Sequence, residues 1–282
     1  MSASGVRVRE LARTFEARDG TRVEALAGIS LDIEPGSFSC IVGPTGCGKT
    51  TLLRVVAGLL EPTAGSVEVG DAPVTGPRRE TGMVFQQYSL FPWRSVLDNV
   101  GFGLEVRGVN KPERHARARE LLELVGLSRF ERSRPYELSG GMQQRVAIAR
   151  SLATDPDLLL MDEPFGALDE RTRHRLQDEL LAVWQRTGKT VLFVTHNIDE
   201  AVYLGERVIV LADRPSRIAD DLSVGLARPR DRVAPGFTAA LLRVRAVLEA
   251  VMQQSGSGDT EPKTGGTDEE RPDSRGPACC GR

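Results

Sequence analysis

The most constraining feature of the sequence is one short loop motif at residues 43–50. It reads Gly43-Pro-Thr-Gly-Cys-Gly-Lys49-Thr50 and matches the phosphate-binding pattern G-x-x-x-x-G-K-[ST] at every fixed position. Its glycines let the backbone approach an anion closely, so that consecutive N–H groups line a positively polarised nest. Lys49 offers an ammonium to the outer phosphates, and Thr50 offers a hydroxyl oxygen to Mg²⁺. The motif therefore predicts a site for a nucleotide polyphosphate.

The segments on either side of the loop favour the same interpretation. Residues 38–42 form a short β-rich run, and residues 51–57 follow as a helical pattern with Gly58 placed as the C-terminal cap. The loop would then lie at a helix N-terminus, where an anion is favoured. A chance glycine-rich turn would not require this order of strand, loop and helix. The residues expected to contact the nucleotide here are Gly43, Pro44, Thr45, Gly46, Cys47, Gly48, Lys49, Thr50 and Thr51.

Composition and charge narrow the class of protein. The chain has 282 residues, 40% of them hydrophobic and 27% charged, which suffices for one large globular domain or two modest ones. Its formal net charge of -2 gives no reason to expect a nucleic-acid partner. No apolar run approaches the ~20 residues of a transmembrane helix, and the N-terminus lacks the apolar core of a signal peptide. The four cysteines show no disulfide or zinc spacing, so we expect a cytosolic protein.

The order of strand and helix patterns predicts an α/β fold with an inserted subdomain. Residues 6–42 alternate apolar runs with turns, which indicates an antiparallel β layer. Later strands alternate with helices and predict a mainly parallel sheet. We expect a domain over residues 1–252, in which a helical subdomain at about 88–154 is inserted between core segments 1–87 and 155–252. A last helix is expected at 238–252, and the Gly-, Ser- and charge-rich stretch 253–282 is expected to be a disordered tail.

Two adjacent carboxylates, Asp162 and Glu163, follow the four apolar residues of the buried-strand pattern at 157–162. Asp162 is placed to hold Mg²⁺, and Glu163 is placed to orient or deprotonate an attacking water. Such a pair would otherwise be interpreted as a helix N-cap. The phosphate loop elsewhere in the chain favours the catalytic interpretation.

A second glycine motif opens the helix that begins near residue 139. Ser139 suits an N-cap, and Gly140 and Gly141 expose N–H groups beside the positive end of the helix dipole. An ordinary capped helix does not need two glycines, each of which costs roughly 1 kcal/mol relative to alanine. We therefore interpret these three residues as a further anion-binding element.

Three single residues complete the candidate site. His196 ends a buried strand, at the edge of the sheet where ligands bind in open α/β folds, although a lone histidine is more often structural. Gln86 ends another strand and is placed to reach Mg²⁺ or the attacking water. Phe15 lies in the N-terminal β layer, where it either stacks on an adenine base or packs in the core, and the sequence leaves both open.

In combination, these motifs resemble the ATP-binding cassette (ABC) family over about residues 6–230. The loop resembles Walker A, residues 138–145 the signature motif, and residues 158–163 Walker B with its catalytic glutamate. The resemblance implies a P-loop NTPase (RecA-like) core that hydrolyses ATP with Mg²⁺. The remaining matches are Phe15 to the aromatic A-loop, Gln86 to the Q-loop, Asp169 to the D-loop and His196 to the switch histidine.

The family resemblance also implies how the site works. Two copies would close head to tail, so that Ser139, Gly140 and Gly141 of one cap the γ-phosphate that is held by Lys49 of the other. The residues implied to serve catalysis are Glu163, His196 and Gln86, the implied metal ligands are Thr50, Gln86 and Asp162, and Asp169 is implied to lie at the nucleotide site.

Three further stretches, residues 90–100, 162–169 and 194–204, resemble the importer subgroup for nitrate, sulfonate and taurine. This implies separate transmembrane permease subunits, an indirect periplasmic or extracellular solute-binding protein, and a peripheral position on the cytoplasmic face of the membrane. The aromatic run from Tyr88 to Trp93 would receive a helix of the permease or pack within the helical subdomain. An exporter cassette and a soluble, non-transport ABC ATPase are the alternatives.

Overall fold

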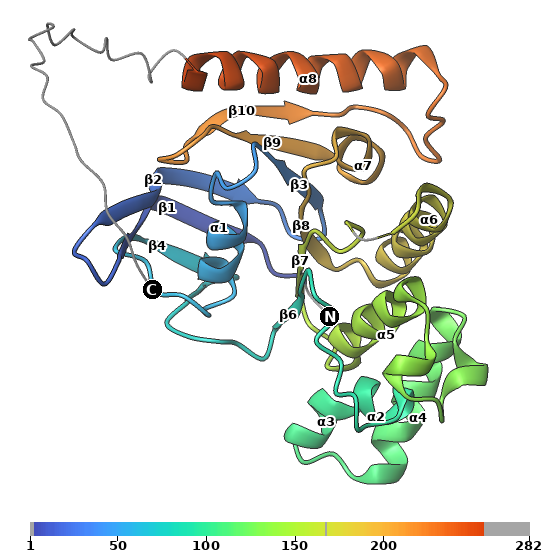
Figure 1. The fold of residues 1–282 in the computed structure, drawn as a ribbon. Helices are drawn as coiled ribbons and strands as arrows, with labels where there is room; N and C mark the ends of the chain where they lie inside the picture. The colour runs from blue at the N-terminus through green and yellow to red at the C-terminus, as the bar shows by residue number, and fades with distance from the viewer. Residues whose placement is uncertain (1–2, 167, 257–282) are drawn as a thin grey trace, which may run out of the picture.

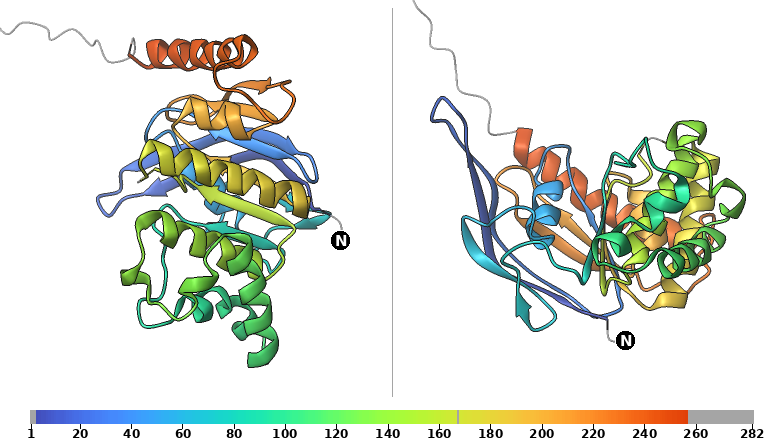
Figure 2. Two further views of the ribbon diagram at one scale, coloured as in Figure 1. Left: turned by 90° about the vertical axis from the view of Figure 1, so that its right-hand side faces the viewer. Right: turned by 90° about the horizontal axis from the view of Figure 1, so that it is seen from below.

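The computed structural model describes residues 3–166 and 168–256 (Figure 1). A larger β-sheet lies at its centre with helices on both faces, and a smaller β-sheet lies at one side (Figure 1 and Figure 2). Among the described residues, no helix is long and apolar enough to cross a membrane. Residues 257–282 of the expected tail lie outside the described part of the chain.

The smaller sheet is antiparallel and has the strand order β2-β1-β4-β5. β1 (Val6–Glu16) pairs with both β2 (Arg22–Ile33) and β4 (Ala64–Val69), and β5 (Ala72–Pro73) extends β4. The predicted antiparallel layer is therefore present. Its continuation to residue 42 was wrong, because the last apolar run of that region joins the second sheet.

The larger sheet has the strand order β10-β9-β3-β8-β7-β6. All its neighbouring pairs are parallel except β10 with β9, which confirms the predicted, mainly parallel α/β core. The three central strands are buried in every residue, as expected when both faces of a sheet are covered. The strands are β3 (Phe38–Val42), β6 (Thr81–Val84), β7 (Leu158–Asp162), β8 (Thr190–Val194), β9 (Arg207–Leu211) and β10 (Ile218–Ser223).

Alternate residues of the central strands belong to two different apolar clusters. In β8, Val191 and Phe193 pack with the cluster that includes the helical region, whereas Leu192 and Val194 pack with α1 (Lys49–Val56) and the antiparallel sheet. This follows from the period of two in a strand. Each fully buried side chain of this size contributes about 1.5–3 kcal/mol of burial free energy. The loop that precedes α1 is therefore held between two packed layers.

The helices between β6 and β7 form the predicted helical subdomain. They are α2 (Val96–Val100), α3 (Phe102–Val106), α4 (Lys111–Leu124) and α5 (Gly140–Ala153), with 3₁₀ turns at Ser128–Phe130 and Pro135–Glu137. This subdomain and the antiparallel sheet lie on opposite sides of the molecule (Figure 2). The domain boundaries themselves stay a prediction.

The last third of the chain supplies α6 (Glu170–Thr187), α7 (Ile198–Leu204) and α8 (Pro235–Gly256). α8 runs alongside the edge strand β10 (Figure 1). It continues to Gly256, so the expected start of the tail at residue 253 was four residues too early. Helix propagation is cooperative and carries the backbone past Val251, the last buried residue of α8 that is described.

Gly58 offers a test of this packing. It follows α1 in a left-handed conformation (φ +71°), and an added Cβ would lie 2.1 Å from the Gly76 carbonyl oxygen. We expect Gly58→Ala to lower the free energy of unfolding by about 3 kcal/mol, the sum of a conformational and an overpacking cost. Denaturant titration measures this value.

Gly188 provides the matched control, because it ends α6 with φ +61° and an added Cβ would meet nothing within 4 Å. Gly188→Ala should cost only the conformational part, about 1 kcal/mol. Equal losses in the two variants would contradict the packing described around Gly58.

Candidate functional site

The phosphate loop connects β3 to α1, as the sequence predicts. α1 begins at Lys49, so its N-terminus points into the loop, where partial positive charge accumulates. Gly48 is its N-cap in a left-handed conformation (φ +112°), and an added Cβ would lie 2.9 Å from the Ala25 carbonyl oxygen. Glycine at this position is therefore required by both the turn and the contact with β2.

Lys49 is buried within the loop. Its Nζ donates to the carbonyl oxygens of Gly43 and Pro44, both at 2.8 Å. In the described part of the chain these bonds go to carbonyl oxygens rather than to a carboxylate, and a buried ammonium is costly without a counter-charge. The site therefore suits an anion that brings negative charge with it.

The end of β7 meets the start of α1 at a pair of oxygens. The Thr50 hydroxyl donates to Asp162 Oδ1 at 2.9 Å. Burial raises the pKa of the Asp162 carboxyl above its ordinary value, and the adjacent Glu163 carboxylate also raises it. Hydroxyl and carboxylate oxygens are ligands that Mg²⁺ accepts, together with phosphate and water. Within the described residues no group of three or more His, Cys, Asp or Glu side chains could hold a metal ion by itself.

Three strand ends bring the other predicted polar residues together. Glu163 follows β7, and its Oε2 lies 3.5 Å from Gln86 Nε2 and 3.1 Å from His196 Nδ1. Gln86 follows β6 and His196 follows β8, which are the two neighbours of β7 in the sheet. Glu163 has φ +44°, a conformation that costs free energy for a residue with a side chain and that recurs at functional sites.

These side chains surround a cavity of about 400 Å³ above the phosphate loop. Its volume is in the range of small-molecule sites. None of its lining residues comes from α5. Ser139, Gly140 and Gly141 therefore do not line the cavity of their own chain. The lining residues are Thr45, Gly46, Gly48, Lys49, Thr50, Thr51, Gln86, Glu163, His196 and Arg214.

The glycines of the second motif have a structural reason that the sequence did not reveal. Ser139 is the N-cap of α5, as predicted, and its Oγ accepts from the Met142 N–H at 3.4 Å. Gly141 is buried, and an added Cβ would lie 2.8 Å from Thr172 Cγ2. An added Cβ on Gly140 would lie 3.2 Å from the Tyr88 hydroxyl oxygen. The argument that an ordinary capped helix does not need these glycines was therefore wrong for Gly141, because a Cβ there would crowd the Thr172 side chain. Anion binding by this motif stays a prediction.

Asp169 and Phe15 lie outside the cavity lining. Asp169 is the N-cap of α6, where it accepts from the Thr172 N–H at 3.0 Å, and that bond lowers the pKa of its carboxyl. The Phe15 side chain is 38% exposed, with the Arg13 guanidinium 4.8 Å from its ring centroid. Core packing does not account for so exposed an aromatic ring, and its stacking on adenine stays a prediction.

Sequence reasoning missed one residue that lines the cavity and one buried residue beside it. Arg214 lines the cavity, and its Nε donates to the Gly46 carbonyl oxygen at 2.5 Å. Glu200 is buried and accepts from the Thr195 hydroxyl at 2.6 Å, next to His196, and burial raises the pKa of its carboxyl. Arg214 follows β9 at the carboxyl edge of the parallel strands. Ligands bind at that edge in open α/β sheets, so the rule that located His196 could also have located Arg214.

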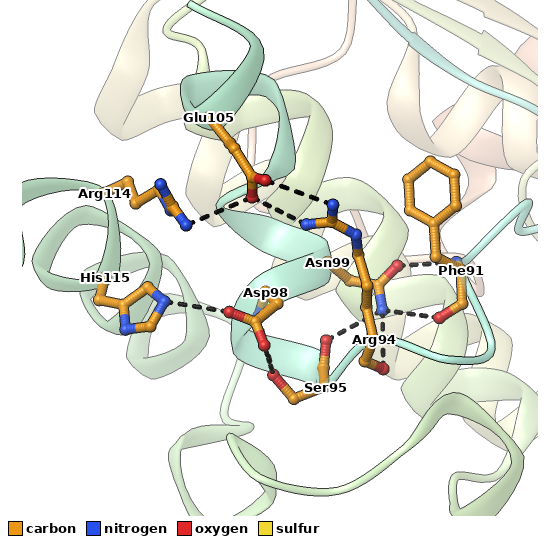
Figure 3. A network of polar contacts seen from close by, with 8 residues as sticks. All are labelled: Phe91, Arg94, Ser95, Asp98, Asn99, Glu105, Arg114 and His115. Carbon is orange, nitrogen blue, oxygen red and sulfur yellow. Dashed lines mark hydrogen bonds and ion pairs between the residues drawn. The ribbon is translucent and has the colours of Figure 1, made fainter. Parts of the chain in front are cut away.

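The aromatic run after Gln86 divides into buried and exposed parts. Tyr88 and Leu90 pack against the larger apolar cluster, whereas Trp93 is 70% exposed. The segment is held by the fully buried Asn99, whose side chain accepts from the Phe91 N–H at 2.8 Å and donates to its carbonyl at 3.1 Å (Figure 3). The run thus presents Trp93 from a fixed support.

That support belongs to a polar network on α2, α3 and α4 (Figure 3). Arg94 forms an ion pair with Glu105 at 2.8 Å, which Arg114 also contacts at 3.4 Å. Asp98 joins α2 to α4 through His115 at 3.0 Å. The network fixes the surface of the helical subdomain around the exposed indole.

Comparison with known proteins decides the family. The model of the ABC transporter family matches residues 26–166, which include the phosphate loop, the Ser139 motif and the carboxylate pair. The chain belongs to the ABC transporter family. It is accordingly an ATP-hydrolysing cassette protein, as the resemblance of its motifs indicated.

Relatives of the ABC transporter family match most of the chain. An uncharacterized ABC transporter ATP-binding protein of Methanocaldococcus jannaschii is 52% identical over 86% of this chain and 91% of its own length. The taurine import ATP-binding protein TauB of Roseobacter denitrificans is 50% identical over 76% of this chain and 80% of its own. The nitrate import ATP-binding protein NrtD of Synechocystis is 50% identical over 81% and 85%.

The fold agrees with solved ABC cassettes. The ATP-binding cassette MJ0796, in a dimeric post-hydrolysis state bound to ADP and Pi, is 34% identical with a TM-score of 0.70 and covers 77% of this chain and 98% of its own. The fold is therefore that of an ABC cassette, with its P-loop core, antiparallel layer and helical region.

The contact between Gly141 and Thr172 is testable. We expect Gly141→Ala to lower the free energy of unfolding by about 1 kcal/mol, because overpacking outweighs the gain in helix propensity. In a Thr172→Ser background, where Cγ2 is absent, the same change should raise it by about 1 kcal/mol. Denaturant titration without nucleotide measures both values, and an identical effect in the two backgrounds would contradict the contact.

Proposed function

We propose that this chain is the ATP-hydrolysing subunit of a membrane importer for nitrate, sulfonate or taurine-like solutes. The observation that carries the proposal is the meeting of Lys49, Thr50 and Glu163 at one cavity above the phosphate loop, with Asp162 bonded to the Thr50 hydroxyl. The import function is supported by relatives that are named taurine and nitrate import ATP-binding proteins.

In this proposal the phosphate loop binds the phosphate chain of ATP. Its N–H groups and the α1 N-terminus supply partial positive charge, and Lys49 exchanges its carbonyl partners for phosphate oxygens. Mg²⁺ would be held by the Thr50 hydroxyl and by Asp162, directly or through water, with Gln86 completing the ligands. When bound, the ion neutralises negative charge on the phosphates.

Hydrolysis in such a site depends on positioning and on charge stabilisation. Glu163 lies at the end of β7 with its carboxylate directed to Gln86 and His196, so it is placed to orient the attacking water and to accept its proton. His196 is held at the end of β8 by the contacts around Thr195, and its exposed ring is placed to donate to the terminal phosphate.

A second copy of the chain would complete the site. Ser139 and Gly140 are exposed at the N-terminus of α5, yet they do not line the cavity of their own chain. An exposed helix N-terminus with glycine N–H groups suits the γ-phosphate of ATP bound to a partner. The solved cassettes that resemble this chain are described as dimeric. Asp169 and the start of α6 would lie beside the contact between the two copies.

The membrane partners follow from the same proposal. Transport requires permease subunits, and Trp93 on its fixed support is the surface residue that we assign to them. The chain would then lie peripherally on the cytoplasmic face of the membrane, and a solute-binding protein would act on the other side without touching it.

The role of Glu163 is tested by Glu163→Gln. This change keeps the size of the side chain but removes the proton acceptor, so we expect ATP to bind with unchanged affinity while turnover falls by at least about 100-fold. Phosphate release and nucleotide titration measure the two effects. Undiminished turnover would contradict the assignment.

Lys49→Ala is the complementary variant, because it removes the buried ammonium from the loop. It should weaken ATP binding by at least about tenfold, since a charge-assisted contact to phosphate is lost. A variant that binds ATP normally but does not hydrolyse it would assign Lys49 to turnover alone.

Trp93→Ala tests the permease surface. Because the indole is 70% exposed, we expect the free energy of unfolding and the ATPase rate of the isolated chain to change little. Assembly with the permease, or the coupling of ATP hydrolysis to uptake, should be lost. Phe130→Ala is a control at another partly exposed aromatic of the subdomain, and coupled transport in Trp93→Ala would exclude this surface.

A further inference from the structure

We propose that Arg214 is a further nucleotide-binding residue, which contacts the phosphate chain of ATP from the turn between β9 and β10. The inference rests on the proposed ATP site. Arg214 would add to that site a cation that belongs neither to the phosphate loop nor to the carboxylate pair or the Ser139 motif.

The turn that carries Arg214 is fixed to the core of the molecule. It closes on itself through the Ala212 N–H, which donates to the Arg217 carbonyl at 2.8 Å. Ser216 is fully buried; its N–H donates to the Ala25 carbonyl at 3.1 Å, and its carbonyl accepts from the Ala27 N–H at 3.0 Å. These two bonds attach the turn to β2, one of them at the same Ala25 carbonyl that approaches Gly48. The turn therefore holds its residues at a defined place next to the loop.

The side chain of Arg214 reaches from this turn to the phosphate loop. Its Nε donates to the Gly46 carbonyl oxygen at 2.5 Å, and its Nη2 lies 3.9 Å from the point where a Cβ on Gly46 would stand. The bond to Gly46 thus holds the guanidinium against the backbone of the loop. It lines the same cavity as Lys49, Thr50 and Glu163.

The two amino groups of this guanidinium remain for a ligand. The bond to Gly46 uses Nε, and in the described part of the chain no carboxylate forms an ion pair with Arg214. The neighbouring Asp213 carboxylate accepts instead from the Arg214 backbone N–H at 2.8 Å. A guanidinium fork matches the geometry of phosphate oxygens, so a bound phosphate chain is the partner that this arrangement suits.

Arg214 and Lys49 differ in how they would bind. Lys49 is buried and already bonded to two loop carbonyls, whereas Arg214 is exposed at the edge of the cavity. An exposed cation loses little hydration in the free state, and its attraction for phosphate is screened by salt. Arg214 should therefore add affinity that falls as ionic strength rises.

The test is the dissociation constant of Mg-ATP for the full chain in the Glu163→Gln background, measured by isothermal titration calorimetry. Adding Arg214→Gln should raise it about tenfold at about 0.05 M KCl, which corresponds to about 1.4 kcal/mol. At about 0.5 M KCl the difference should shrink to about threefold or less. Arg214→Lys keeps the charge but loses the guanidinium fork, so its dissociation constant should lie between those of the background protein and Arg214→Gln.

Arg217→Gln is the matched control, because Arg217 is exposed in the same turn and does not line the cavity. It should bind ATP like the background protein. A change of less than twofold in Arg214→Gln would overturn the inference, and so would a loss that is equal at both salt concentrations, which would indicate only a change in loop shape. Absence of ATP binding in the background protein itself would instead contradict the proposed function.

Discussion

The hydrogen bond from the Thr50 hydroxyl to Asp162 Oδ1 joins the two parts of the molecule on which the site depends. Thr50 lies in the first turn of α1, and Asp162 ends the central strand β7. Through this contact the positive end of a helix is held against the carboxyl edge of the parallel sheet. The neighbouring strand ends then deliver Gln86 and His196 to Glu163, because adjacent parallel strands end at the same edge.

Much of this arrangement could be predicted from local pattern. Apolar runs of four to five residues predicted the buried strands β3, β7 and β8, and the phosphate loop predicted the turn that precedes α1. Parallel strands end at the same edge of a sheet, so the polar residues directly after those runs had to lie close together at that edge. The contacts between distant segments could not be read in this way. Thr172 beneath Gly141 and Arg214 beside Gly46 lie 31 and 168 residues away from their partners in the chain.

The same limit explains where the sequence reasoning went wrong. Two glycines at a helix N-terminus were attributed to an anion alone, because the cost of glycine in a helix is visible in the sequence whereas a methyl group 31 residues away is not. Asp169 caps α6 with its carboxylate, and its expected place at the nucleotide site stays a prediction. The approach of Gly141 to Thr172 places the start of α6 against the Ser139 motif, so a change in one would affect the packing of the other. In the proposed dimer, a nucleotide held at the Ser139 motif would lie next to this contact.

The central claim is that one chain carries two halves of different ATP sites. Sedimentation of the Glu163→Gln variant with Mg-ATP tests it most directly, because that variant should retain its nucleotide. The account predicts a dimer with Mg-ATP, a monomer without nucleotide, and a monomer with Mg-ATP when Gly140→Asp is added to place a carboxylate at the motif. A Glu163→Gln chain that binds ATP and still sediments as a monomer would contradict the account.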